Sequence, residues 1–136
     1  MPQAGGEAMR LASDEPGKRL WFVPDAYLPP PKPAEPLVNH EAVCLLNAGK
    51  RDAHVTLTVY FEDREPIRDI RVALPAERCL HLRLDKPEAL GGVSIPVGVP
   101  YALRVESDVN IIVQHSRLDV TQPNLALFTT VAYAEE

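Results

Sequence analysis

Residues 53–62 read AHVTLTVYFE, and apolar and polar side chains alternate along them. In an extended chain, successive side chains point to opposite faces, so such a segment has one apolar face and one polar face. This pattern predicts a β-strand that is buried on one side only. The two sets are Val55, Leu57, Val59 and Phe61 on the apolar face, and Thr56, Thr58 and Tyr60 on the polar face.

The same period of two continues on both sides of this segment, and no stretch has the 3.6-residue period of a helix. Residues 40–47 are almost entirely apolar after Glu41, which is typical of a strand buried on both faces. Short strands about ten residues apart indicate an all-β fold, an antiparallel β-sandwich or jelly roll of about eight strands. The expected strands are residues 20–23, 40–47, 53–62, 70–74, 79–84, 101–105, 109–119 and 125–134.

The connections carry turn and loop signals. Residues 47–52 (NAGKRD) fit a hairpin between the strands on either side, and residues 63–66 (DREP) fit a second turn. Residues 85–98 contain three glycines and two prolines and predict a long loop. The prolines of residues 29–36 predict an extended surface loop of polyproline character, with a proline-rich recognition motif as the alternative.

Size and composition place the chain among soluble globular proteins. Its 136 residues are 46% hydrophobic and 24% charged, which suits one domain with one core. Residues 1–19 are expected to form a flexible tail, and residues 20–136 a single β-sandwich domain. No apolar run approaches the roughly 20 residues that cross a bilayer, and residues 1–19 lack the apolar region of a signal peptide. A cytoplasmic location is therefore expected.

Five strings of the sequence together resemble the sensory rhodopsin transducer family, the soluble transducers of cyanobacterial type. The resemblance spans residues 20–134, and the strings occur in the same order as in the family. They are WFVPDAYLPP (residues 21–30), HEAVCLLNAG (40–49), VTLTVYFEDREP (55–66), RCLHLRLD (78–85) and VQHSRLDVTQPNLALFTTVAYA (113–134).

The resemblance implies more than the composition does. It implies a small soluble β-sandwich that assembles into a homotetramer and docks on the cytoplasmic side of a membrane photoreceptor, a sensory rhodopsin. It also implies a fold similar to carbohydrate-binding modules, with a sugar-like small molecule as ligand. DNA binding in transcription is a further implied role.

Two histidine–arginine pairs are candidate binding residues. His81 and Arg83 are two residues apart on one strand, as are His115 and Arg117 on another, so each pair shares a strand face. If the two faces meet, they form a cationic patch suited to carboxylate, phosphate or sugar hydroxyls. The alternative is that these side chains hold strands in register by pairing with carboxylates such as Glu41, Asp63 and Asp119.

A more specific interpretation of His40, His81 and His115 is a zinc site, with the three histidines supplied by separate strands. No HxH or HExxH spacing supports it, and the two cysteines, Cys44 and Cys79, lack CxxC spacing. The sequence therefore predicts neither a metal nor a cofactor.

A turn and three aromatic residues complete the candidate binding site. Asp63 and Arg64 lie in the turn after the alternating strand, where a rigid scaffold often carries binding groups. The alternative interpretation of Asp63 and Arg64 is that they form a solvated charged turn with no binding role. An exposed aromatic ring can stack on the apolar face of a sugar, which makes Trp21, Tyr27 and Tyr60 candidates. Trp21 equally fits a core position.

Catalysis has little support. No GxSxG or GxxxxGK[ST] motif occurs, and Cys44 lies in an apolar run, which works against its use as a nucleophile. The sequence therefore favours a binding and signalling module over an enzyme.

Two alternatives to photoreceptor signalling remain. The first is a carbohydrate or small-molecule binding module without a photoreceptor. The second is a DNA-binding regulator, against which the formal net charge of −5 argues. DNA contact would need an oligomer face on which arginines cluster: Arg64, Arg68, Arg71, Arg78, Arg83 and Arg117.

Overall fold

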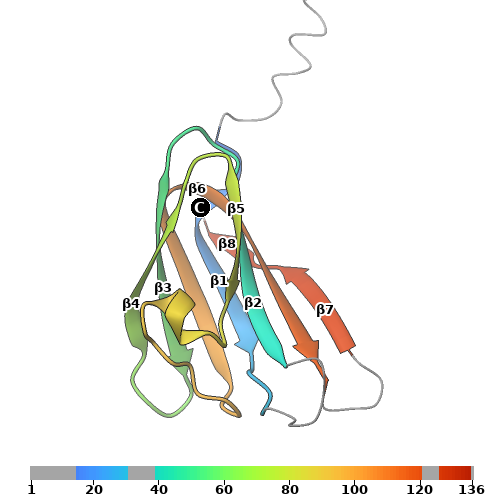
Figure 1. Cartoon of the computed structure of the whole chain (residues 1–136). Helices are drawn as coiled ribbons and strands as arrows, with labels where there is room; N and C mark the ends of the chain where they lie inside the picture. Colours follow the sequence, from blue (N-terminus) through green and yellow to red (C-terminus); the bar gives the residue numbers. More distant parts are fainter. Residues whose placement is uncertain (1–14, 31–38, 121–125, 136) are drawn as a thin grey trace, which may run out of the picture.

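The computed structural model describes residues 15–30, 39–120 and 126–135, and these form an almost entirely β structure (Figure 1). A 3-10 turn, Pro87–Leu90, interrupts the long loop expected at residues 85–98. The strands are β1 (Lys18–Ala26), β2 (His40–Asn47), β3 (Ala53–Phe61), β4 (Ile67–Leu74), β5 (Arg78–Arg83), β6 (Tyr101–Asp119), β7 (Ala126–Val131) and β8 (Tyr133–Glu135).

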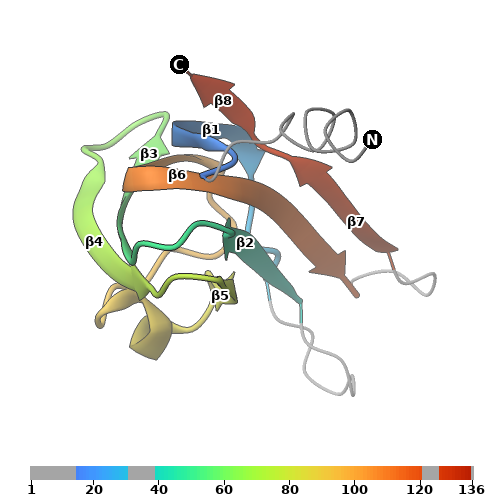
Figure 2. The same cartoon turned by 90° about the horizontal axis from the view of Figure 1, so that it is seen from above.

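The 19-residue strand β6 organises the fold because it belongs to two sheets. Its first half pairs with β3 and β1, which continue to β4 and β8 in the order β4-β3-β6-β1-β8. Its second half pairs with β2 and β7, and β5 pairs with β2. All pairs are antiparallel, and Figure 2 shows β6 curving between the two sheets. The prediction of an all-β antiparallel fold of eight strands is confirmed.

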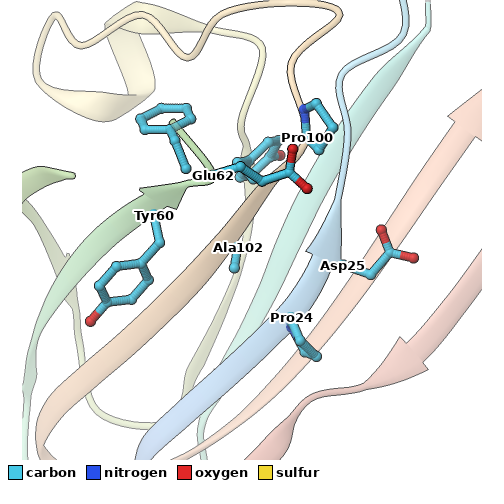
Figure 3. Close-up of a pocket in the computed structure, with 8 residues that line it drawn as sticks. Pro24, Asp25, Tyr60, Glu62, Pro100 and Ala102 are labelled. Carbon is cyan, nitrogen blue, oxygen red and sulfur yellow. The ribbon is translucent and has the colours of Figure 1, made fainter. Parts of the chain in front are cut away.

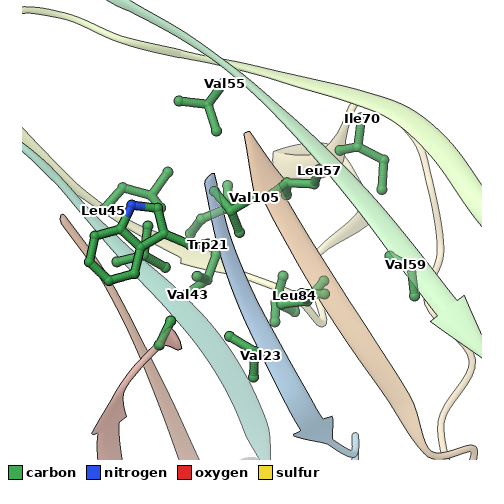
Figure 4. Close-up of a cluster of buried hydrophobic side chains, with 14 of the residues drawn as sticks. Trp21, Val23, Val43, Leu45, Val55, Leu57, Val59, Ile70, Leu84 and Val105 are labelled. Atoms are coloured by element: carbon green, nitrogen blue, oxygen red, sulfur yellow. The ribbon is translucent and has the colours of Figure 1, made fainter. Parts of the chain in front are cut away.

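Alternating side chains of both sheets form the core (Figure 4). Val55, Leu57 and Val59 point inward from β3, each at most 1% exposed, as the alternation of residues 53–62 predicts. Val43 and Leu45 of β2 face them from the other sheet. Strand β2 is not buried on both faces as expected, because Leu46 is 40% exposed.

The expected division into strands was wrong at two places. The runs 101–105 and 109–119 are one strand, because the buried Ser107 occupies an inward position where an apolar residue was expected. Buried and more exposed positions alternate without a break from Tyr101 to His115. Conversely, the run 125–134 is two strands, because β7 pairs with β6 whereas β8 pairs with β1. The buried Ala132 lies between them, and its N–H still donates to the Val113 carbonyl of β6 (3.1 Å). At the N-terminal side, β1 begins at Lys18, two residues before the expected start, and residues 1–14 and 31–38 lie outside the described residues.

The turn at residues 63–66 joins the paired strands β3 and β4, as expected, but the connection at residues 47–52 is not a hairpin. Strand β2 pairs with β5 and β6, whereas β3 pairs with β4 and β6. The connection is a corner built around the buried Asn47. Its Nδ2 donates to the carbonyls of Arg51 (2.8 Å) and Leu74 (3.2 Å), and its Oδ1 accepts the Gly49 N–H (3.0 Å).

Replacing Asn47 with alanine is expected to lower the free energy of unfolding by about 2 kcal/mol, because buried backbone groups lose their partners. Urea unfolding measures this change. Asn110→Ala is the control, since half-buried Asn110 donates one bond, to the Glu15 carbonyl. Equal losses in the two variants would show that Asn47 does not hold the corner.

Candidate functional site

A buried carboxylate, Glu41, lies at the centre of a polar cluster inside the fold. Its side chain is 0% exposed, and the strand register places Glu41 of β2 directly opposite Arg117 of β6. The Arg117 Nε donates to Oε2 (2.7 Å), and the Tyr27 backbone N–H donates to both carboxylate oxygens (3.0 Å each). The Tyr101 hydroxyl donates to Oε1, and the His115 Nε2 lies 3.3 Å from Oε2.

The second layer of this cluster comes from β7. The Arg117 guanidinium carbon lies 5.0 Å from the centroid of the Phe128 ring, and the His115 ring meets Phe128 edge to face at 6.2 Å. The Arg117 Nη2 is buried and has no hydrogen-bond partner in the part of the chain that the structure describes. Glu41 is therefore the group that compensates the Arg117 charge.

The cluster keeps Glu41 ionised. Burial alone raises the pKa of this carboxyl, but the interactions with His115, Tyr101, the Tyr27 amide and Arg117 together hold the pKa below its ordinary value of 4.5. Burial, with the Glu41 charge next in importance, raises the pKa of Tyr101 well above 10, so its hydroxyl stays protonated and donates.

A pH dependence of stability follows from the lowered pKa of Glu41. When the pKa of a carboxyl is lower in the folded than in the unfolded protein, the ionised carboxylate stabilises the fold. This contribution is fully present above the unfolded-state pKa, and it is lost as the pH falls through the folded-state pKa. We expect stability to fall steeply below about pH 4.5, with a shallower slope in Glu41→Gln, which cannot titrate at this position. Thermal unfolding between pH 3 and pH 7 measures both slopes, and equal slopes would contradict the assignment.

The two histidine–arginine pairs do not meet on one face. His115 pairs in register with the buried Val43 and is 1% exposed, whereas His81 pairs with Cys44 and is exposed. One pair thus faces the core and the other faces outward, so no shared cationic patch forms. The alternative interpretation of these side chains was pairing with carboxylates, and the structure shows such pairing for both arginines. Arg83 pairs with Asp85 (2.7 Å), which was not among the carboxylates named from the sequence.

The remaining polar candidates are dispersed. His40 lies half-buried at the start of β2. Asp119 ends β6 opposite Ala126 and is half-buried. Because His40 and His81 do not face inward with His115, the three histidines do not converge. Within residues 15–30, 39–120 and 126–135, no group of three or more His, Cys, Asp or Glu side chains is placed to hold a metal ion.

A surface cavity of about 310 Å³ lies where β1 and β3 end beside the start of β6 (Figure 3). Tyr60, a predicted site residue, lines it. Two carboxylates, Asp25 of β1 and Glu62 after β3, come from opposite sides of β6. The full lining is Pro24, Asp25, Tyr60, Phe61, Glu62, Pro100, Tyr101 and Ala102.

This lining offers hydrogen-bonding groups and ring surface to a bound molecule. The carboxylates accept hydrogen bonds from hydroxyl or amine groups, and the rings offer apolar surface. Tyr101 links the two features, because it lines the cavity and also donates to Glu41. The sequence reasoning missed Asp25, Glu62 and Pro100, since each is ordinary in its own segment and only strand pairing brings them together.

Three other predicted site residues lie outside this cavity. Asp63 and Arg64 pair with each other (2.9 Å) in the exposed turn, and the Arg64 guanidinium lies 5.3 Å from the Phe61 ring centroid. Trp21 is 6% exposed in the core, and its indole N–H donates to the Lys18 carbonyl (3.0 Å). Its ring is therefore not available to stack on a sugar, and its alternative as a core residue is correct.

The cysteines and arginines form no further site. Cys44 is half-buried and Cys79 exposed, and both are free thiols. Of the six arginines considered for DNA contact, three pair with carboxylates: Arg64 with Asp63, Arg83 with Asp85, and Arg117 with Glu41. Arg117 also points into the fold, so these arginines do not share one basic face.

Comparison with known proteins shows relatives over most of the chain. The chain shares 41% sequence identity with the protein in the crystal structure of Thermotoga maritima 1070. The two structures superpose with a TM-score of 0.78, and the match covers 88% of this chain and 97% of that one. It is 40% identical to the Anabaena sensory rhodopsin transducer, with a TM-score of 0.68 over 76% of this chain and 90% of that one. No curated protein matches the chain. A family model described as Anabaena sensory rhodopsin transducer (ASRT) matches residues 16–134, and the chain therefore belongs to this family.

Proposed function

We propose that this chain is a cytoplasmic binding module that transmits the signal of a membrane photoreceptor, a sensory rhodopsin, and that it is not an enzyme. The observation that carries the proposal is membership of the transducer family over residues 16–134, together with 40% identity to the Anabaena sensory rhodopsin transducer. Within the described residues, no helix is long and apolar enough to cross a membrane.

Flash spectroscopy tests the signalling half of this proposal. A transducer that binds a receptor in one state more tightly than in another changes the rates of the receptor's photocycle. We expect the decay of a sensory rhodopsin intermediate to change when saturating amounts of the chain are added. The same amount of chain should leave a light-driven ion pump unaffected. An unchanged photocycle in every sensory rhodopsin tested would count against signalling.

The cavity supports a second role, the binding of a sugar-like small molecule. Its volume of about 310 Å³ lies at the lower end of small-molecule sites. Tyr60 supplies a half-buried ring, and Asp25 and Glu62 supply hydrogen-bond acceptors on two sides. An aromatic face flanked by acceptors matches the alternating apolar and hydroxyl surfaces of a sugar ring.

A thermal-shift panel of neutral mono- and disaccharides tests this role. A sugar that binds should raise the melting temperature of the wild type, and this rise should be lost in Tyr60→Ala and weakened in Glu62→Gln. Tyr133→Ala is the matched control, because Tyr133 is 62% exposed and lies outside this cavity. No shift across a broad panel, or an equal loss in Tyr133→Ala, would exclude the cavity as a sugar site.

We also propose that the chain works as a homotetramer. Among the described residues, six large apolar side chains are at least 40% exposed, and four of them belong to β7 and β8, which favours coverage of these two strands by other chains. Light scattering of the purified chain measures the mass directly, and a monomer at all concentrations would contradict the proposal. The six are Leu46, Val97, Leu127, Phe128, Val131 and Tyr133.

A further inference from the structure

The cavity beside Tyr60 carries two carboxylates and no cation. Asp25 and Glu62 are both exposed, and the lining contains no lysine, arginine or histidine. Neither carboxylate takes part in a hydrogen bond or an ion pair within the part of the chain that the structure describes. Other acidic side chains are engaged, as Asp63 and Asp85 are with arginines. The two carboxylates of the cavity are therefore available to a ligand.

A small residue makes room between these carboxylates. Ala102 of β6 lies on the outer face of the sheet, directly opposite Tyr60 of β3, and β1 runs along the other side of β6. Because neighbouring strands are about 4.8 Å apart, the backbones of β1 and β3 are separated by about 10 Å across β6. Figure 3 shows Ala102 between Tyr60 and Asp25, with Glu62 above them. The methyl group of Ala102 leaves open the space that a larger side chain would fill.

The aromatic walls of the cavity favour a cation independently of the carboxylates, because the face of an aromatic ring attracts positive charge. One wall already shows this interaction: the Arg64 guanidinium lies 5.3 Å from the centroid of the Phe61 ring. Arg64 does not neutralise the cavity, since it pairs with Asp63 (2.9 Å). The half-buried ring of Tyr60 supplies a second aromatic wall. Carboxylates and rings thus point to the same kind of ligand.

We propose that this cavity selects amino sugars over neutral sugars, through charge-assisted hydrogen bonds from the ammonium group to Asp25 and Glu62. The proposal rests on the sugar-binding role proposed above and names the class of sugar. A neutral sugar takes water from two charged groups and returns only neutral hydrogen bonds, which is unfavourable. An ammonium group has three N–H donors and a positive charge, so it replaces that water and offsets the repulsion between the two carboxylates.

A bare calcium ion suits this cavity less well than an organic ammonium group. Ca²⁺ takes about six to eight oxygen ligands, whereas the lining supplies only two carboxylates, Asp25 and Glu62. The search for three or more His, Cys, Asp or Glu side chains placed to hold a metal found no such group in the described residues. The aromatic walls add to the binding of an organic cation, because its ring also has apolar surface to bury.

Calorimetric titration with matched sugars tests this selectivity. Glucosamine, glucose and N-acetylglucosamine share one ring, and at about pH 6 only glucosamine carries a charge. We expect glucosamine to bind at least about tenfold more tightly than the other two, because hydrogen bonds between charged groups are the stronger kind. In the double variant Asp25→Asn, Glu62→Gln the three affinities should become nearly equal. Glu77→Gln is the matched control and should keep the preference, because Glu77 is exposed and lies outside this lining.

Ala102→Leu locates the ligand without changing any charge. Leucine fills the floor of the cavity, so this variant should lose glucosamine binding while its circular dichroism spectrum stays that of the wild type. The proposal is overturned if glucose binds the wild type as tightly as glucosamine, and the sugar-binding role then remains. It is also overturned if the double variant keeps the preference, or if folded Ala102→Leu still binds glucosamine. If none of the three sugars binds the wild type, the sugar-binding role and the selectivity both fail.

Discussion

Replacing Glu41 with alanine is expected to lower the free energy of unfolding by about 3–5 kcal/mol, the range found when one partner of a buried ion pair is removed. The reason lies in the surroundings of the carboxylate. Arg117 is 18% exposed and its Nη2 has no other partner in the described chain, so its charge would remain buried without compensation. The Tyr27 N–H and the Tyr101 hydroxyl would lose their acceptor as well.

Urea unfolding of Glu41→Ala and Arg117→Ala, singly and combined, separates pairing from packing. The double variant should lose less than the sum of the single losses, because the second removal eliminates a charge that the first left unpaired. Asp63→Asn is the surface control: it breaks the exposed pair with Arg64 and should change stability by less than about 1 kcal/mol. Additive losses in the double variant would show that the pair contributes no coupling.

The second large effect is expected in the core. Leu57 lies in the middle of β3 and is 0% exposed, so Leu57→Ala should cost about 2–5 kcal/mol from lost burial and the cavity left behind. Val97→Ala is the control, because Val97 is 52% exposed and should change stability by less than about 0.5 kcal/mol. Thermal and urea unfolding measure both. A loss below about 1 kcal/mol at Leu57 would mean that β3 does not pack as described.

The period-two pattern predicted most of the fold, because it depends only on which face of each strand is buried. It predicted β2 at residues 40–47 and the inward face of β3 correctly. It failed at Ser107, because a small buried polar residue interrupts an apolar pattern without interrupting a strand. It also assigned a hairpin to residues 47–52, because a turn signal does not say which strands pair afterwards.

The candidate site was harder to predict, since its contacts join distant parts of the chain. Glu41 and Arg117 were both chosen as polar candidates, yet only the β2–β6 register places them opposite each other. The outward face of His81 follows from the β2–β5 register, in which His81 pairs with Cys44, and cannot be read from the spacing of His81 and Arg83. The cavity beside Tyr60 depends on three strand ends meeting, which no local pattern records.

Binding of the purified chain to a sensory rhodopsin in lipid nanodiscs tests the central claim most directly. The Anabaena sensory rhodopsin transducer is the positive control, and nanodiscs carrying a light-driven ion pump are the negative control. Saturable binding to the sensory rhodopsin is expected, with none to the pump. Absence of binding at about 100 µM, a concentration at which even a weak complex with a Kd of about 10 µM would be mostly formed, would contradict it if the positive control binds.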